Sequence, residues 1–300
     1  MRKIFTGVLL VATALLFWGC SIGGGDTPPS MDYSSPTIGT LKYVPAGTFQ
    51  RDSDPGNTST VSAFRMSEYE IDRVQFYAIM GKDPSDTEYS SFIYDPVQMA
   101  NWYDAIAFCN KLSIAEGLTP VYSVSTVSDW EALAYASIPD YSDAGWSGAA
   151  ADWDADGYRL PTEMEWMWAA MGADTADPGA VNTTGYSKAF AGSTGTNNIG
   201  DYAWYSSNSG GTTHPSGGKS ANELNLYDMS GNVFEWCWDW YEDPYPTGAV
   251  SDYRGAASGV QRIYRGGSWN LSDALCAVGY RGANIPELRN AGIGFRVVRP

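Results

Sequence analysis

The sequence predicts an α+β domain with two main helices, little sheet and much irregular backbone. Two segments have the apolar spacing of helices, whereas most other apolar segments are short and are separated by Gly and Asn. Glycine, tryptophan and tyrosine contribute 33, 12 and 20 of the 300 residues. This composition favours a loop-rich fold with aromatic anchors over a helical bundle.

The N-terminus is typical of an export signal. Two basic residues precede an apolar run over residues 4–18, which is too short for a comfortable transmembrane helix, and Cys20 follows. This order resembles a bacterial lipobox. We therefore expect residues 1–19 to be a lipoprotein signal peptide and Cys20 to carry the lipid, with plain secretion as the alternative. Residues 20–40 are rich in Gly, Ser and Pro, which predicts a flexible tether.

One domain is expected over residues 41–300, because no repeat and no shift in composition divides them. Residues 41–48 alternate apolar and polar side chains and predict a strand that enters a hairpin. Residues 61–76 begin with a strand-like run. Four side chains in and just beyond that segment are expected to face the core: Tyr69, Val74, Phe76 and Tyr77.

The two helices are predicted over residues 102–118 and from Pro161 to Gly172. The first has apolar residues near helical spacing and stops at Gly117. The second starts with proline, which favours the first turn, and ends at a glycine. Further along, three tryptophans alternate with polar residues as in a half-buried strand, and we interpret them as core residues rather than a ligand platform: Trp236, Trp238 and Trp240.

Charge and cysteine content restrict the partners and the cross-links. The formal net charge of −16 repels phosphate backbones and anionic lipids, which argues against nucleic acid as a partner. Apart from Cys20, the chain has Cys109, Cys237 and Cys276. An exported protein can form a disulfide. The preferred pair is Cys237 with Cys276, because they lie in neighbouring motifs.

Residues 152–163, DWDADGYRLPTE, fit the pattern of a calcium-binding loop. No helix is evident before them, however, and Pro161 already begins the next helix. An acidic turn is therefore the preferred interpretation. His214 is the only histidine, so a three-histidine metal site or a base–nucleophile pair has no support, and we expect a loop residue.

Several motifs in a fixed order resemble the sulfatase-modifying-factor, or formylglycine-generating-enzyme, family. They are YVPAGTF (43–49), YEIDRVQF (69–76), PVQMANWYDAIAFCNKLS (96–113), GYRLPTEMEWMWAA (157–170), NELNLYDMSGNVFEWCWDW (222–240), RGGSW (265–269) and IGFRVV (293–298). The resemblance implies a single domain with a modified C-type lectin fold. It also implies that GYRLPTE is a structural signature.

The resemblance has consequences for metals. Oxidases of this family hold copper with two cysteines that follow the Gly-Gly-Ser-aromatic motif, and the matching positions here are Leu271 and Cys276. One thiolate does not supply the two sulfurs that copper prefers, so copper is not expected. The iron sulfoxide synthases of the family need a histidine cluster, which this chain lacks. A structural calcium ion is expected at the positions that match the family's calcium loop: Asp228, Gly231, Val233 and Glu235.

The C-terminal region, residues 265–300, is also similar to that of variable proteins of diversity-generating retroelements, which share this fold. In such proteins, substitutions scatter at asparagine-type codons while scaffold residues stay fixed. The scaffold would comprise Arg265, Gly266, Gly267, Trp269, Cys276, Arg281, Pro286, Arg289, Gly294 and Phe295. The ligand-binding set is expected to comprise Trp269, Asn270, Leu271, Ser272, Asp273, Ala274, Val278, Gly279, Tyr280, Gly282, Ala283, Asn284, Ile285, Leu288, Asn290 and Ala291.

The sequence therefore predicts a non-catalytic lipoprotein, anchored in a bacterial outer membrane, that displays its C-terminal loop to an unknown protein or other surface ligand. Such a surface requires a rigid backbone and core, so that its exposed side chains can be substituted without unfolding the domain. The alternatives are an oxidase of the formylglycine-generating type and an extracytoplasmic accessory factor.

Overall fold

A computed structural model describes residues 31–300, so the predictions for residues 1–19 and for Cys20 lie outside the described residues. The strands are β1 (Tyr33–Ser35), β2 (Gly39–Val44), β3 (Gly47–Gln50), β4 (Thr58–Val61), β5 (Phe64–Ser67), β6 (Tyr122–Ser123), β7 (Ala150–Ala151), β8 (Phe234–Trp240), β9 (Val250–Ser251), β10 (Arg262–Arg265), β11 (Gly282–Asn284), β12 (Ile293–Gly294) and β13 (Val298–Arg299). The α-helices are α1 (Arg73–Met80), α2 (Trp102–Ala115), α3 (Ala144–Ser147) and α4 (Glu163–Ala170).

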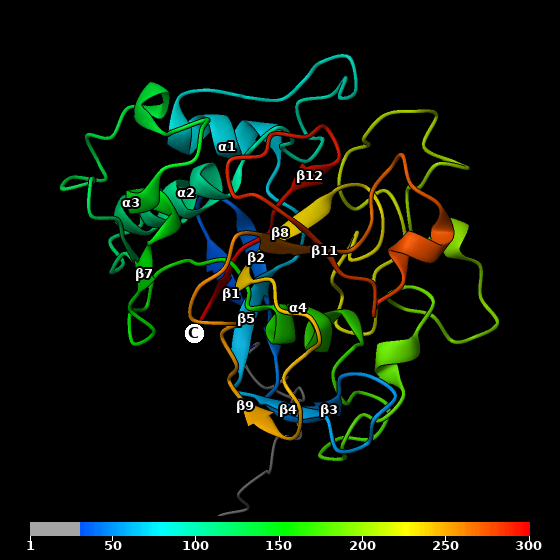
Figure 1. Ribbon diagram of the computed structural model, residues 1–300. Coiled ribbons are helices and arrows are strands. Elements are labelled where there is room, and N and C mark those ends of the chain that lie inside the picture. The colour runs from blue at the N-terminus through cyan, green and yellow to red at the C-terminus, as the bar shows by residue number, and fades with distance from the viewer. Residues whose placement is uncertain (1–30) are drawn as a thin grey trace, which may run out of the picture. The chain divides into compact units, whose positions relative to one another are not determined.

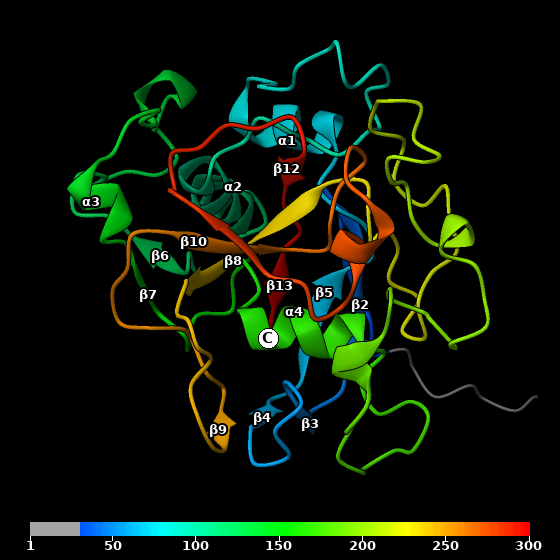
Figure 2. The ribbon, with the colours of Figure 1, turned by 45° about the vertical axis from the view of Figure 1, so that its right-hand side comes forward.

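Two four-stranded sheets organise these elements, one in the order β1-β2-β5-β13 and the other in the order β11-β10-β8-β12. The second sheet lies between α1 and α2 on one side and α4 on the other (Figures 1 and 2). Side chains tie both helix layers to its central strand. Trp102 of α2 donates to the carbonyl of Cys237, and Trp166 of α4 donates to Glu235.

The sequence locates both predicted helices and the tryptophan strand correctly. Helix α2 begins after Asn101, whose side chain forms a capping box with Asp104, and a left-handed Gly117 follows its end. Helix α4 begins after Thr162. The three tryptophans lie on β8. Trp236 is fully buried, Trp238 is 9% exposed and Trp240 is half-buried, which confirms their place in the core.

The tether prediction is too long at its C-terminal end. Residues 33–35 form β1 and pair antiparallel with the start of β2, so the folded unit already includes residues 31–40. Ser35 fixes the turn between the strands because its Oγ accepts from the amides of Thr37 and Ile38 and donates to Glu116. A Ser-rich segment that looks like linker is thus held by local side-chain hydrogen bonds.

Helix α1 is not predicted from the sequence, and the side chains that it buries also differ from those expected in this segment. Asp72 caps its first turn, and Phe76 is fully buried as expected. Tyr69, Val74 and Tyr77, however, are 37%, 39% and 59% exposed. The expectation that these three side chains face the core is wrong: Val74 and Tyr77 lie on the side of α1 that faces away from α2, and Tyr69, which precedes the helix, stacks on Tyr227. No helix within residues 31–300 is long and apolar enough to cross a membrane.

Candidate functional site

The C-terminal loop, residues 269–291, connects β10 to β12 and runs across one side of the second sheet (Figure 1). The chain enters it through Gly266 and Gly267, which both have positive φ angles. A Cβ atom on Gly267 would lie 2.7 Å from the sulfur of Cys276. Only glycine therefore allows the loop to fold back against its own first turn.

Most of the predicted ligand-binding residues reach solvent. The exposed ones are Asn270, Ser272, Asp273, Ala274, Gly279, Ile285 and Asn290. The half-buried ones are Leu271, Tyr280, Ala283, Asn284, Leu288 and Ala291. Tyr280, the tyrosine of the predicted set, stacks on Phe234 with ring centroids 6.1 Å apart. Its ring therefore belongs in part to the scaffold.

Three of the sixteen predicted residues are buried, so the prediction that they contact a ligand is wrong for this structure. They are Trp269, Val278 and Gly282. Trp269 donates from Nε1 to the carbonyl of Ala291 at 2.9 Å and closes the base of the loop. Val278 is fully buried in the core around α4. A Cβ on Gly282 would lie 1.9 Å from the ring of Tyr264.

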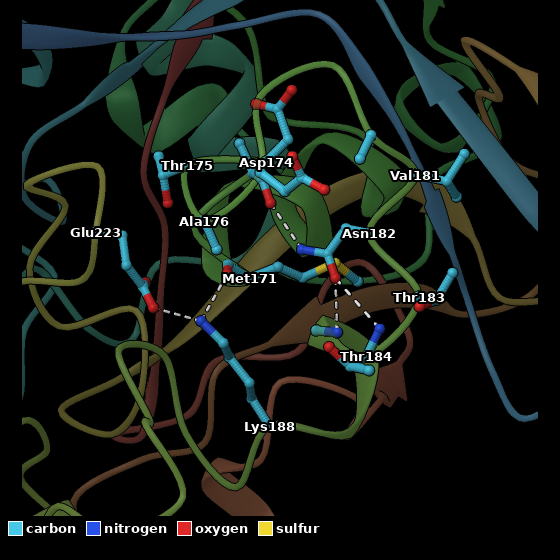
Figure 3. A pocket seen from close by; sticks show the side chains of 14 residues that line it. Met171, Asp174, Thr175, Ala176, Val181, Asn182, Thr183, Thr184, Lys188 and Glu223 are labelled. Atoms are coloured by element: carbon cyan, nitrogen blue, oxygen red, sulfur yellow. Dashed lines mark hydrogen bonds and ion pairs between the residues drawn. The ribbon is translucent and has the colours of Figure 1, made fainter.

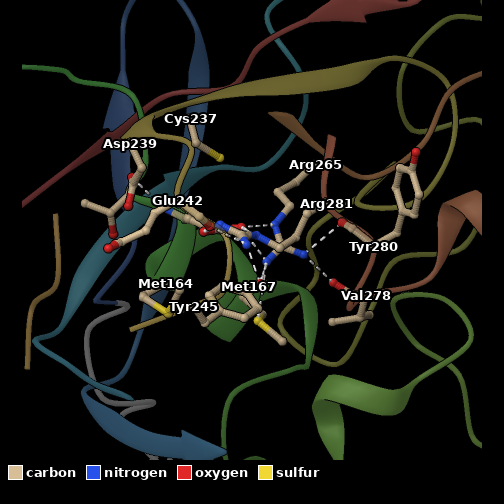
Figure 4. A network of polar contacts seen from close by, with 12 residues as sticks. Met164, Met167, Cys237, Asp239, Glu242, Tyr245, Arg265, Val278, Tyr280 and Arg281 are labelled. Carbon is tan, nitrogen blue, oxygen red and sulfur yellow. Dashed lines mark hydrogen bonds and ion pairs between the residues drawn. The ribbon is translucent and has the colours of Figure 1, made fainter. Parts of the chain in front are cut away.

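A buried ion-pair network, which we call the loop clamp, fixes the first half of the loop to α4. It comprises Glu163, Tyr245, Arg265 and Arg281 (Figure 4). The Glu163 carboxylate lies 2.8 Å from Arg265 and 2.6 Å from Arg281. Glu163 is 2% exposed and Arg265 is fully buried. Arg265 also donates to the carbonyls of Val278 and Tyr280, at 3.0 and 2.8 Å.

A second anchor holds the end of the loop to the N-terminus of α2. Arg289 forms an ion pair with the fully buried Asp104 and donates to the carbonyl of Met99 at 2.9 Å. The amide of Trp102 donates to the carbonyl of Pro286 at 2.9 Å. Burial raises the pKa of Asp104, and Arg289 opposes that shift. The loop thus contains one short strand, β11, which pairs with β10, and ion pairs of Arg281 and Arg289 fasten it to α4 and α2.

The structure does not form the predicted disulfide. In the described part of the chain, Cys109, Cys237 and Cys276 are all free and buried. The thiols of Cys237 and Cys276 face the carbonyls of Glu235 and Ser272, with sulfur–oxygen distances of 3.9 and 3.8 Å. Burial raises the pKa of Cys276 to about 12, so its thiol is protonated at neutral pH. With Leu271 at the other copper position, the donor set does not fit a two-sulfur copper site.

Three of the predicted calcium positions precede β8 and the fourth, Glu235, lies on that strand; both carboxylates of the set already have protein partners. Glu235 forms a two-pronged ion pair with Arg296, at 2.7 Å for both contacts, and accepts from Trp166 at 2.6 Å. Asp228 accepts from the amide of Gly217 through one oxygen, and its other oxygen is buried without a partner among the described residues. Calcium binding here stays a prediction that requires Glu235 to release Arg296.

The two other positions of that set supply backbone. Gly231 has a φ angle of 81°, and the amide of Val233 donates to Glu70 at 3.1 Å. Across residues 31–300, no group of three or more His, Cys, Asp or Glu side chains is placed to hold a metal ion. In the acidic turn, Glu163 would be the last calcium ligand, but it belongs to the loop clamp. His214 is a loop residue whose ring stacks on Trp204, at 3.8 Å between centroids.

Two cavities border this region. One, of about 420 Å³, lies at the end of α4, and at its wall Lys188 contacts Glu223 and the carbonyl of Met171 (Figure 3). The other, of about 490 Å³, is lined by Tyr135, Tyr141 and Arg289 among others. Neither is lined by any of the sixteen predicted ligand-binding residues. The loop therefore offers a surface rather than an enclosed pocket.

The acidic partners in the two anchors, Glu163 and Asp104, are not among the residues predicted from the sequence. Glu163 was assigned to an acidic turn, although it follows a helix N-cap and is buried. Asp104 completes a capping box with Asn101, and that spacing is a recognisable signal. The arginine partners of the two acids, Arg265 and Arg289, were expected to be scaffold, and their contacts agree with that role.

Comparisons with known proteins agree with the resemblance seen in the sequence. Residues 31–300 match the sulfatase-modifying factor enzyme 1-like domain. A curated relative, the chaperone protein LppX of Paenibacillus barcinonensis, is 32% identical over 318 aligned positions that cover 100% of this chain and 99% of the relative. The formylglycine-generating enzyme of Thermomonospora curvata is 27% identical and covers 89% of this chain and 98% of its own length.

Solved structures support the fold as well. Treponema denticola variable protein 1 superposes with a TM-score of 0.78 at 38% identity, covering 91% of this chain and 100% of its own. The structure of PvdO from Pseudomonas aeruginosa superposes with a TM-score of 0.61 at 20% identity, which covers 91% and 99%. The modified C-type lectin fold expected from the sequence is therefore confirmed, and the chain belongs to the sulfatase-modifying factor enzyme 1-like family.

Proposed function

We propose that this protein is a non-catalytic, surface-displayed lipoprotein that binds a ligand through the exposed side chains of its C-terminal loop. The observation that carries the proposal is the construction of the loop. Irregular backbone is fixed at one end by the loop clamp and at the other by the Arg289–Asp104 ion pair. The exposed side chains of the loop, such as Ser272 and Asp273, can change without disturbing the core, as a binding surface requires.

Similarity to Treponema denticola variable protein 1 supports this function, because that likeness covers 91% of this chain at 38% identity. Applied here, it suggests that the loop varies between copies of the gene. The residues predicted to vary that the structure leaves accessible, such as Ser272, Asp273 and Ala274, are suited to such change. The DNA beside the gene tests this part: a near-copy of the 3′ end that differs at adenines is the expected finding.

An oxidase of the formylglycine-generating type is the function that the site supports less well. Its chemistry would need two cysteines, whereas this chain has Leu271 and a buried, protonated Cys276. The decisive experiment incubates the full chain with copper and a cysteine-containing sulfatase peptide, followed by mass spectrometry. We expect no change in peptide mass. Conversion of the thiol to an aldehyde, abolished by Cys276→Ser, would refute a non-catalytic role.

A second candidate is an extracytoplasmic accessory factor, and one observation favours it. The relative named chaperone protein LppX matches this chain from end to end. A chaperone activity is tested by adding the protein to a chemically denatured enzyme and following light scattering during dilution. Suppressed aggregation at near-stoichiometric amounts would support this candidate, and unchanged scattering would leave ligand binding by the loop as the function.

The membrane anchor is part of the same proposal. Lipid attachment at Cys20 predicts that the full-length protein partitions into detergent and that Cys20→Ser abolishes the partitioning. Chemical labelling of intact cells then reports whether the domain faces outward. A protein that stays in the aqueous phase with Cys20 intact would favour plain secretion instead.

A further inference from the structure

Helix α1 and the segment after it expose a contiguous set of large apolar side chains, which we call the apolar patch. It comprises Val74, Tyr77, Phe92, Ile93 and Tyr94, exposed by 39%, 59%, 60%, 55% and 61%. The amide of Val74 donates to the carbonyl of Ile93 at 3.2 Å, which places the helix and the segment side by side. Soluble proteins expose single apolar side chains freely, but contiguous groups mark interaction sites.

The backbone under the patch is held by buried charges. Arg73, 9% exposed, donates to the carbonyl of Ser90 at 2.7 Å and to that of Phe92 at 3.4 Å. Asp95, fully buried, accepts from the hydroxyl of Ser90 and the amide of Phe92. In this segment the charged side chains of Arg73 and Asp95 are therefore buried while the side chains of the apolar patch are exposed, which is the reverse of the usual arrangement. Such rigid presentation lowers the entropy lost on binding.

The patch continues the surface of the C-terminal loop. The ring of Tyr89, just before the patch, stacks on Trp269 at the base of the loop, with centroids 5.3 Å apart. The amide of Met99 donates to the carbonyl of Asn290 at 3.0 Å. Both ribbon views place α1 beside the chain that leads into β12 (Figures 1 and 2). A ligand on the loop can thus extend onto α1.

We propose that the apolar patch is a constant docking surface for a protein partner that presents an apolar anchor within a basic surface. The inference rests on the proposed function and names the class of its ligand. The side chains of the patch enclose no cavity described above, as a small ligand would require. Exposed aromatic residues are instead typical of the centre of a protein interface.

The charge of the protein decides the chemistry of the partner. With a net charge of −16, the domain attracts a basic rim and repels an acidic one. The same charge disfavours an anionic lipid surface as the occupant. It also disfavours a second copy of this chain, because two equally acidic surfaces would face each other.

The test pans a displayed library of random peptides against the full chain and measures the affinity of recovered peptides for variants. The first variant combines Phe92→Ser with Tyr94→Ser. The matched control is Val260→Ser, which changes an exposed apolar residue outside the patch, 76% exposed. A loop variant, Asp273→Lys, reports on the proposed binding loop. Unchanged thermal unfolding shows that each variant is folded, because all these side chains are exposed.

The expected peptides carry apolar residues flanked by Lys or Arg, and the patch variant binds them about tenfold or more weakly, while the control binds them normally. If the patch variant binds as tightly as wild type, or no peptide is recovered, the docking surface is refuted. Weakening by Asp273→Lys alone would then leave the loop function standing, whereas weakening by neither variant would refute both.

Two further measurements cover the other occupants. Co-sedimentation of the chain with phosphatidylcholine–phosphatidylglycerol vesicles, lost in the patch variant, would overturn the proposal in favour of a membrane. Sedimentation velocity that shows a dimer of the wild type and a monomer of the patch variant would overturn it in favour of a second copy. We expect the patch variant to sediment with vesicles to the same extent as wild type, since any lipid on Cys20 is common to both, and we expect no patch-dependent dimer.

Discussion

Replacing Glu163 with glutamine is expected to unfold the base of the C-terminal loop. Its carboxylate is 2% exposed and compensates two guanidinium groups, those of Arg265 and Arg281, at 2.8 and 2.6 Å. Glutamine keeps the shape but removes the charge, so the fully buried Arg265 loses its anionic partner. Removing one member of a buried pair costs about 3–5 kcal/mol, a large part of a domain stability of about 5–15 kcal/mol.

The assay is equilibrium unfolding in urea, followed by tryptophan fluorescence, with Glu223→Gln as the control. Glu223 pairs with Lys188 at the surface, where side-chain exposure is 33% and 21%, so its loss is expected to cost about 0–1 kcal/mol. Hydrogen exchange supplies the local readout: amides of residues 276–281 should lose protection in Glu163→Gln. A Glu163→Gln variant that is no less stable than Glu223→Gln would refute the clamp as the loop's anchor.

Three other predictions follow from burial. Gly282→Ala should lower the free energy of unfolding by about 1–3 kcal/mol, because its Cβ would lie 1.9 Å from Tyr264. The exposed substitution Ala274→Arg should change the free energy of unfolding by no more than about 0.5 kcal/mol. Equal losses of stability in urea unfolding would contradict this prediction. The buried thiols, including Cys276 with its pKa of about 12, should resist a thiol reagent near neutral pH until the protein is unfolded; rapid native labelling would disprove it. Burial, then repulsion by nearby carboxylates, raises the pKa of Asp239 well above 3.8, so wild type gains stability as pH falls through that folded pKa. The Asp239→Asn variant has no carboxyl to protonate, so it should be at least as stable as wild type near neutral pH, and the difference in stability should shrink as the pH falls toward 3.8. A variant that is less stable than wild type near neutral pH would contradict this prediction.

The sequence predicts those parts of the fold that depend on local pattern. Helix α2 and the tryptophan strand β8 have the correct periodicity, and the glycines after the helices lie where the chain turns. Helix α1 escaped detection because the apolar residues Val74 and Tyr77 face solvent and obscure its buried face. The capping box of Asp72 and Gln75 was the signal that could have revealed it.

The place of the C-terminal loop in the fold can be predicted in outline, because the loop follows a Gly-Gly pair that is visible in the sequence. Its energetics were not predictable in the same way. Glu163 and Arg265 are 102 positions apart, and no local pattern connects them. The disulfide prediction failed for a similar reason, since proximity of motifs does not show which way each thiol points. Burial of Val278 and Gly282 depends on packing against α4 and Tyr264, which only the fold reveals.

Besides the ion pairs of Arg281 and Arg289, several contacts hold the C-terminal loop by its peptide groups. Arg265 binds the carbonyls of Val278 and Tyr280, and Trp269 binds that of Ala291. Every amino acid carries the same carbonyl, so these contacts do not depend on which codon occupies the position. In this arrangement the backbone of a residue helps to fix the loop conformation, and its side chain is left free to contact a ligand. A lineage could exchange the outward side chains repeatedly and inherit the same loop conformation each time.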